Sequence, residues 1–225
     1  MDINYLKRII GVAIVAFSLE PLFLTTSLNA ETAELYVERG IDKHENGDYL
    51  AAIDLHSKAI EINPCYLLAY YNRGNSKSQL SDHSGAIIDY NKVIKIFPNY
   101  SSAYINRGTS KGMLGDYVGA ISDYNIALKF KPNDESIYSN RGLEKFYSGD
   151  YSGALADFNK AIEINPKYGI AYSNRGLVKT KPGYRDGLPP KNACADFKKA
   201  AALGFQPRID YLKSEDGSWC RKMKR

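Results

Sequence analysis

The chain has 225 residues, of which 44% are hydrophobic and 24% are charged, and its formal net charge is +5. This is the composition of a globular protein, which excludes wholesale disorder and a collagen-like chain. Three Cys and three His are too few for a disulfide scaffold and leave little material for a metal centre. The count of 18 Tyr against 8 Phe and 1 Trp is unusual and favours a repeated unit that carries Tyr.

The first thirty residues have the features of an export signal. Two basic residues precede an apolar stretch over residues 9–19, and the small residue Ala30 ends the segment. This order is typical of a signal peptide that is cut after Ala30. Two alternatives stay open, namely an uncut membrane anchor over residues 9–28, in which Glu20 would be costly, and a helix packed on the following domain. The first two interpretations place residues 31–225 outside the cytosol, in the periplasm, in a lumen or in the medium.

Four residue types recur with a period of 34 residues. A register that several residue types share over four or five periods indicates stacked supersecondary units. The recurring residues are Tyr36, Tyr70, Tyr104, Tyr138 and Tyr172; Gly40, Gly74, Gly108, Gly142 and Gly176; Ala52, Ala86, Ala120 and Ala154; and Pro64, Pro98, Pro132 and Pro166.

Each unit is predicted to form two helices. In the fourth unit, residues 137–148 form the first helix, Gly149 and Asp150 form the turn, and residues 151–164 form the second helix. Pro166 ends the second helix, because proline disfavours helical geometry in the residue before it. Small residues are expected where the two helices cross, since they let the backbones approach. The expected crossings are Gly74–Ala86, Gly108–Ala120 and Gly142–Ala154.

The spacing within a unit resembles the tetratricopeptide repeat. The pattern is an aromatic residue at the fourth position, Gly at the eighth, Ala at the twentieth, an aromatic residue at the twenty-fourth, Ala at the twenty-seventh and Pro at the thirty-second. The fourth unit carries all six: Tyr138, Gly142, Ala154, Phe158, Ala161 and Pro166. The resemblance implies an all-α fold, a right-handed superhelical solenoid of five helix-turn-helix repeats. The five units begin at Ala33, Leu67, Ser101, Glu135 and Gly169.

Two departures from the family pattern recur in every unit, and the units from the second to the fifth also share the string Tyr-x-Asn-Arg-Gly of a known variant. The seventh position is Arg and the eleventh is Lys: Arg39, Arg73, Arg107, Arg141 and Arg175, and Lys43, Lys77, Lys111, Lys145 and Lys179. An Asp stands at the twenty-third position in all units but the first, where it is Leu55. Because both signs of charge share the period, we favour ion pairs within or between units over a basic stripe for an acidic partner. The acidic members are Asp89, Asp123, Asp157 and Asp196.

The last unit is altered. Residues 181–191 form a loop rich in Pro and Gly, and the second helix resumes at Ala193 after five inserted residues. Gly204 is predicted to cap that helix. The repeat domain therefore covers residues 31–204, and residues 205–225 are expected to form a partial capping helix and a basic tail.

The cysteines allow one disulfide in the C-terminal part. In an oxidising compartment, a bond between Cys194 and Cys220 would pin the tail to the last unit, and Cys65 would then stay free. The sequence leaves this pairing open.

The resemblance also implies that the first helices of the units line a concave groove. Asn at the sixth position would then form a ladder, whose donors and acceptors suit the backbone of an extended peptide. The alternative is that each Asn bonds to its own scaffold or to water. The ladder is Asn72, Asn106, Asn140 and Asn174, and the other groove candidates are Asn75, Tyr71, Ile105, Leu143, Phe146 and Tyr147, with Val37, Ile41, Leu68, Thr109, Met113, Ile170 and Leu177 beside them.

Catalytic and cofactor motifs are not found in the sequence. It has no Gly-rich nucleotide loop, no nucleophile elbow and no His or Cys pair at metal-ligand spacing, so neither a cofactor nor a metal is expected. His56 stands at the aromatic core position and is expected to be packed. The clamp that some family members use for an acidic C-terminus lacks its three basic residues here.

The function predicted from the sequence is a non-catalytic scaffold that binds a peptide segment of another protein in its groove. Nucleic acid is not an expected partner, and membrane contact would run through residues 9–28 if they stay uncut. Two alternatives are a membrane-tethered assembly factor for a membrane protein complex, and a regulatory or substrate-presenting subunit of an enzyme.

Overall fold

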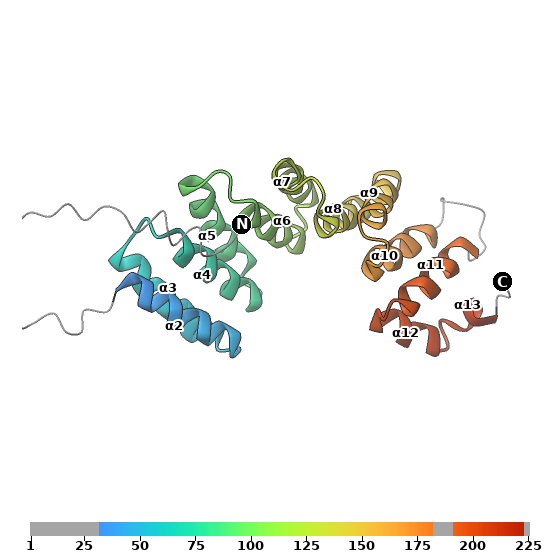
Figure 1. Ribbon diagram of the computed structural model, residues 1–225, viewed down its shortest axis with the longest axis horizontal. Helices are drawn as coiled ribbons and strands as arrows, with labels where there is room; N and C mark the ends of the chain where they lie inside the picture. The colour runs from blue at the N-terminus through green and yellow to red at the C-terminus, as the bar shows by residue number, and fades with distance from the viewer. Residues whose placement is uncertain (1–31, 182–190, 223–225) are drawn as a thin grey trace, which may run out of the picture. The chain divides into compact units, whose positions relative to one another are not determined.

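The computed structural model describes residues 32–181 and 191–222, and these contain twelve α-helices and no strand. The predicted signal or anchor, within residues 1–30, and most of the loop at 181–191 lie outside the described residues. The helices pair in chain order (Figure 1): α2 (Ala33–Glu45) with α3 (Tyr49–Ile62), α4 (Leu67–Gln79) with α5 (His83–Ile96), α6 (Ser101–Met113) with α7 (Tyr117–Phe130), α8 (Glu135–Tyr147) with α9 (Tyr151–Ile164), and α10 (Gly169–Lys179) with α11 (Lys191–Ala202).

The predicted unit boundaries are confirmed. The helices α2, α4, α6, α8 and α10 begin at the five residues where the units were predicted to start. Two shorter helices, α12 (Gln206–Lys213) and α13 (Ser218–Lys222), follow the fifth pair where a capping helix was expected. None of the helices in the described part of the chain is long and apolar enough to cross a membrane.

Aspartate N-caps start the second helices of the first four units. Each side chain accepts a hydrogen bond from the backbone N–H three residues later, which satisfies one of the donors that a helix start leaves unpaired. At α7, Asp116 Oδ1 accepts from the N–H of Gly119 at 2.9 Å. The other caps are Asp48, Asp82 and Asp150.

The turn before these caps needs a left-handed backbone at one residue. Gly47, Gly115 and Gly149 hold this place with φ between 79° and 90°, a conformation that glycine adopts without steric cost. Ser81 holds it in the second unit with a φ of 64°, which an L-residue adopts at a cost. Gly204 ends α11 with a φ of 83°, as predicted.

The crossing of two helices within a unit depends on small residues, as predicted. A Cβ added to Gly108 would lie 3.2 Å from the ring of Tyr124 and 3.3 Å from the carbonyl oxygen of Ala120. Ala120 itself is fully buried. The aromatic residue at the twenty-fourth position therefore packs directly on the glycine of the first helix.

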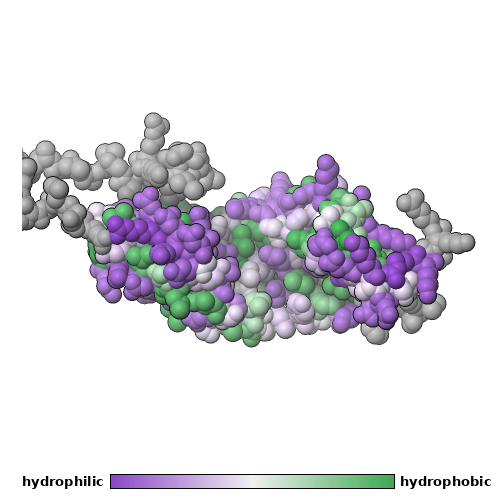
Figure 2. Space-filling model, turned by 90° about the horizontal axis from the view of Figure 1, so that it is seen from below, coloured by the Kyte–Doolittle hydropathy of each residue, from purple (hydrophilic) through white to green (hydrophobic). Residues whose placement is uncertain are grey.

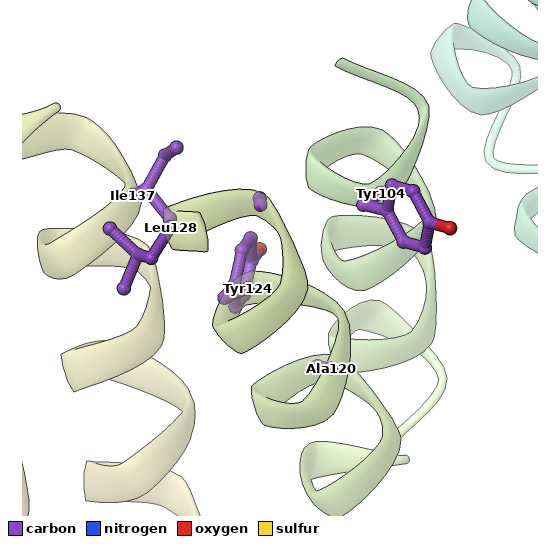
Figure 3. Packing of buried hydrophobic residues seen from close by; sticks show 6 residues of the cluster. Tyr104, Ala120, Tyr124, Leu128 and Ile137 are labelled. Carbon is purple, nitrogen blue, oxygen red and sulfur yellow. The ribbon is translucent and has the colours of Figure 1, made fainter. Parts of the chain in front are cut away.

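The core runs from one unit into the next. Tyr104, Ala120 and Tyr124 of the third unit pack in one cluster with Leu128 and with Ile137, which belongs to the fourth unit (Figure 3). Because each helix pair leaves an apolar face that only the next pair covers, stacking makes the core continuous.

The first helices lie against one another along the stack. Contacts join α2 to α4, α4 to α6, α6 to α8 and α8 to α10, whereas successive second helices make fewer contacts. The first helices therefore form the inner side of the stack, which is the side that the resemblance predicted for the groove.

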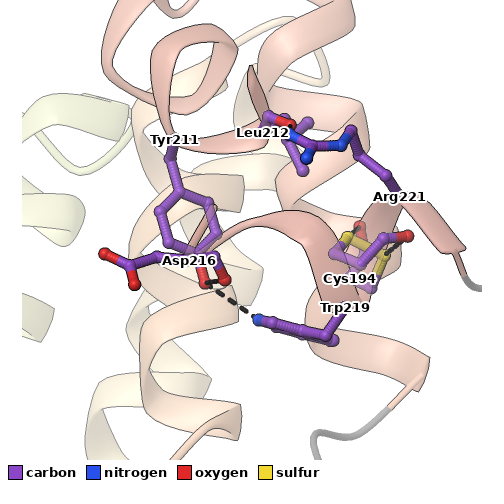
Figure 4. The surroundings of a disulfide bond; sticks show 7 residues. Cys194, Tyr211, Leu212, Asp216, Trp219 and Arg221 are labelled. Atoms are coloured by element: carbon purple, nitrogen blue, oxygen red, sulfur yellow. Dashed lines mark hydrogen bonds between the residues drawn. A yellow bond between two sulfur atoms is a disulfide. The ribbon is translucent and has the colours of Figure 1, made fainter. Parts of the chain in front are cut away.

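The C-terminal segment is bonded to the last unit. Cys194 of α11 and Cys220 of α13 form the disulfide that the sequence left open, and Cys65 is free and exposed. Trp219 Nε1 donates to Tyr211 Oη at 3.0 Å beside this bond (Figure 4). The guanidinium of Arg221 donates to the carbonyl oxygen of Leu212. These contacts fix α13 next to α12.

Candidate peptide-binding face

The recurring arginines are held in ion pairs inside the units. Arg107 donates from Nε and Nη2 to the two carboxylate oxygens of Asp123, at 2.9 and 2.6 Å, and Asp123 is 2% exposed. The same two-pronged pair joins Arg73 to Asp89, Arg141 to Asp157 and Arg175 to Asp196. The ion-pair interpretation is confirmed, and the alternative of a basic stripe that awaits an acidic partner is wrong. The last pair also confirms the five-residue insertion in the fifth unit.

The same network contains two kinds of residue that the sequence analysis did not assign. Lys111 Nζ lies 2.8 Å from Asp123 Oδ2, so each Asp meets a Lys as well as an Arg. Arg107 Nη1 donates to Asn91 Oδ1 of the preceding unit at 2.6 Å, which ties one unit to the next. The guanidinium also lies 5.4 Å from the ring centre of Tyr104. The spacing of Arg and Lys, four residues apart on one helix face, was the signal for their shared partner.

Not all side-chain amides of the Asn ladder lack a hydrogen-bond partner. Asn106 Nδ2 donates to Asn75 Oδ1 at 2.9 Å and to Tyr71 Oη at 3.1 Å, so the expectation of spare amide donors is wrong for this residue. The other three half-buried side chains make no hydrogen bond among the residues that the structure describes: Asn72, Asn140 and Asn174. Their contact with a ligand stays a prediction.

Asn106 belongs to a polar cluster between α4 and α6. Tyr90 of α5 reaches through the unit and donates from Oη to Asn75 Oδ1 at 2.9 Å. Tyr71 lies edge-on to Tyr100, with 5.1 Å between ring centres. Burial, together with the nearby Tyr71, raises the pKa of Tyr100 to about 12. Tyr71, Asn75 and Asn106 are thus brought together, as groove residues should be.

The third and fourth units differ from the second at the place where Tyr90 contacts Asn75. In the third unit, Tyr124 Oη lies 2.9 Å from Thr109 Oγ1, which keeps a polar pair. In the fourth unit, Leu143 packs against the cluster that contains the apolar ring of Phe158. The inner face therefore changes from polar to apolar along the stack.

An aromatic cluster lies where α8 meets the turn to α9. Tyr147 is 56% exposed and stacks on Tyr117 of α7, with ring centres 5.8 Å apart. Phe146 lies between Tyr147 and Tyr151, and the ammonium of Lys181 lies 5.2 Å from its ring centre. Phe146 and Tyr147 are thus close together.

Some apolar groove candidates belong to the core. Val37 is buried against Ala59 and Ala69, so its place in the groove is wrong. Ile105 is half-buried against the core of the third unit. Met113 is 67% exposed. Figure 2 shows hydrophobic residues grouped over parts of one face between hydrophilic areas.

His56 has the packed role that its position predicted. It is fully buried against Gly40, and neither ring nitrogen has a hydrogen-bond partner in the described part of the chain. Burial, and then the positive charges of His44 and Arg73, lower the pKa of His56 to about 4. In residues 32–181 and 191–222, no group of three or more His, Cys, Asp or Glu side chains could hold a metal ion.

One acidic residue of the inner side was missed by the sequence analysis. Glu144 of α8 is 8% exposed, and its Oε2 has no hydrogen-bond partner among the described residues. Burial raises the pKa of this carboxyl to about 7. Glu144 stands at the tenth position of its unit, where no pattern recurs, so the repeat offered no signal for it.

The fold and this inner face define a solenoid of stacked helix pairs. Models of the tetratricopeptide repeat match residues 67–100 and residues 142–183. The chain is therefore a solenoid of tetratricopeptide repeats.

Solved structures with a similar fold cover most of the chain. A MamA protein is 24% identical, with a TM-score of 0.68, over 83% of this chain and 97% of its own. YrrB, described as having an unusual peptide-binding site, is 20% identical with a TM-score of 0.64, over 83% of this chain and 94% of its own. The first repeat domain of Spaghetti (RPAP3), bound to the HSP90 peptide SRMEEVD, is 23% identical with a TM-score of 0.52. The match covers 54% of this chain and 96% of that domain. No curated protein matches the chain in sequence.

Proposed function

We propose that this protein is a non-catalytic scaffold that binds an extended segment of another protein along the inner side of its first helices. YrrB has a peptide-binding site and the Spaghetti domain holds a peptide, so this fold can present a peptide-binding surface. The acidic peptide of the Spaghetti domain is not proposed as the ligand here, because the basic clamp residues are missing from this sequence.

One observation carries the proposal. The side chains of Asn140 and Asn174 are half-buried on successive first helices, 34 residues apart, and neither amide has a partner among the described residues. An amide offers a donor and an acceptor, which match the N–H and C=O groups of an extended chain. Exposed Met113 and Tyr147 add apolar area on the neighbouring helix ends.

Selection from a display library of random twelve-residue peptides tests the proposal. Peptides selected on the wild-type chain should bind the double variant Asn140→Ala/Asn174→Ala less tightly by about 1 kcal/mol or more, since each hydrogen bond contributes about 0.5–1.5 kcal/mol. The matched control is Asn99→Ala, which removes an exposed amide in the loop between α5 and α6. Unchanged affinity in the double variant would place the ligand on another face. Loss of the folded state would make the two Asn structural.

We also propose that the chain works outside the cytosol. The disulfide between Cys194 and Cys220 supports an oxidising compartment, since such bonds are rare in the cytosol. N-terminal sequencing of the protein recovered from its compartment tests the export signal. A new N-terminus at Glu31 is expected, and an intact Met1 on membrane-bound protein would favour the anchor instead.

A further inference from the structure

Glu144 is a buried acid that the fold does not explain. A buried carboxyl without a hydrogen bond is unfavourable, and such groups are uncommon in native proteins. The charged side chains on the helices around it are already paired. Lys111 of α6 is held by Asp123, Lys145 of α8 by Asp157, and Lys179 of α10 by Asp196.

Two of the other junctions between first helices have matched contacts at the tenth position, whereas at the second junction the Oγ of Ser110 is buried without a hydrogen-bond partner among the described residues. At the first junction, His44 Nδ1 lies 2.9 Å from Ser76 Oγ. At the fourth junction, Phe146 and Val178 lie in one apolar cluster. At the third junction, Glu144 faces Gly112, and a Cβ on that glycine would lie 2.4 Å from Glu144 Oε1. The carboxyl thus occupies space that a side chain would fill elsewhere, and none of the described residues forms an ion pair with it.

The carboxyl lies beside the exposed inner surface. Its negative charge is one of the causes, after burial, that raise the pKa of Tyr124, whose Oη contacts Thr109. Thr109 is exposed. Tyr147 follows Glu144 by three residues and therefore lies on the same face of α8, with its ring stacked on Tyr117. A carboxylate on the same helix face as an exposed aromatic ring is an environment that favours a guanidinium or ammonium group.

We propose that Glu144 is the specificity residue of the peptide groove and receives a basic side chain, Arg or Lys, of the bound segment. This inference rests on the proposed function, because it assumes that a peptide lies along the first helices. The basic group supplies the counter-charge that the described residues at the junction of α6 and α8 lack.

The affinity should then depend on pH in a definite direction. With a pKa of about 7, the empty site is mostly protonated at pH 6 and mostly ionised at pH 8. A bound cation favours the ionised carboxylate, so binding releases a proton. Affinity for a basic peptide should rise about tenfold from pH 6 to pH 8, since the ionised fraction rises about tenfold. Tyr124 is the titratable group of α7 near the carboxyl, and its pKa is raised, so it stays neutral in this range.

The test compares peptides selected on the wild-type chain with their binding to Glu144→Gln. The variant keeps the shape of the side chain and removes its charge, and its melting temperature should not fall. The matched control is Glu61→Gln, on the second helix of the first unit, where the side chain is exposed and lies away from the first helices. Selected peptides should carry Arg or Lys at one fixed place, lose about tenfold or more in affinity with Glu144→Gln, and lose their pH dependence.

The outcomes separate this inference from the proposed function. Peptides that bind wild type and Glu144→Gln equally, or that carry no fixed basic residue, would overturn the role of Glu144 and leave the groove intact. If the wild-type chain selects no peptide above background, the proposed function fails and the inference fails with it.

Discussion

The charged network repeats from unit to unit, whereas the inner face of the same helices changes from one unit to the next. The network is nearly identical in four units, with Arg, Lys and Asp at the same positions and with distances of 2.5–2.8 Å in every ion pair. The inner junctions differ from one to the next, from His44 with Ser76 to Glu144 with Gly112. Repetition therefore serves the stacking of units, and the proposed function assigns ligand recognition to the positions that depart from it.

The first unit provides an internal control for this difference. It has Leu55 where the other units have the buried Asp, and His56 where they have Tyr or Phe. Its Asp54 instead pairs with Lys58 at the surface. The exposed Asp54 of the first unit and the buried Asp123 of the third therefore allow a matched comparison.

The largest effect is expected from Asp123→Ala. It leaves Arg107 and Lys111 half-buried without a counter-charge, which should lower the free energy of unfolding by about 3–5 kcal/mol in urea denaturation. The matched control is Asp54→Ala, which breaks an exposed pair and should cost about 1 kcal/mol or less. Equal costs for the two variants would mean that the network does not hold the units together.

His56→Phe should make the stability less sensitive to acid. The pKa of His56 is about 4 in the folded protein and 6.5 in the unfolded chain, so the unfolded state takes up the proton first as the pH falls. Wild type should therefore lose stability relative to the variant between pH 6.5 and 4, by about 1.4 kcal/mol per pH unit and on the order of 3 kcal/mol in all.

The opposite change checks the same prediction in the fourth unit. Phe158→His places an imidazole over Gly142, as His56 lies over Gly40, and should add acid sensitivity. Urea denaturation of the three proteins at pH 4, 5, 6 and 7.5 measures the difference. Parallel pH profiles for wild type and His56→Phe would show that His56 is protonated equally in both states.

A smaller effect is expected at the helix crossing. Ala120→Leu should overpack the contact with Gly108 and lower the free energy of unfolding by about 1–3 kcal/mol. Val118→Leu is the control, because that side chain is exposed on the same helix. A thermal melt of Ala120→Leu that matches the control would contradict the close crossing.

The smallest effect is expected at the left-handed turn. Ser81→Gly should raise the free energy of unfolding by about 0.5–1 kcal/mol, because glycine relieves the strained φ but loses more entropy on folding. Gly115→Ser, at the same position of the third unit, should lower it by a similar amount. Changes of the same sign in both variants would refute the assigned turn.

The sequence predicts the scaffold well because the scaffold is periodic. The starts of the units, the pairs of Arg107 with Asp123, and the cap at Gly204 all follow from register and residue type. The disulfide between Cys194 and Cys220 was one open alternative, since spacing alone does not fix a pairing.

The inner face is less predictable because it depends on single contacts between units. Asn106 was expected to be free, but the neighbouring Tyr71 and Asn75 reach its amide. Val37 was placed in the groove, but it packs in the core of the first unit. Glu144 stands at a position that is Asp42, Ser76, Ser110 or Val178 in the other units, so only the packing opposite Gly112 reveals it.

Amide hydrogen exchange with a selected peptide tests most directly the claim that the ligand lies on the first helices. The peptide should slow exchange in α4, α6, α8 and α10 and leave α5, α7 and α9 close to their rates in the free protein, because only the first helices contact it. Protection confined to the second helices, with α6 and α8 unchanged, would contradict the account.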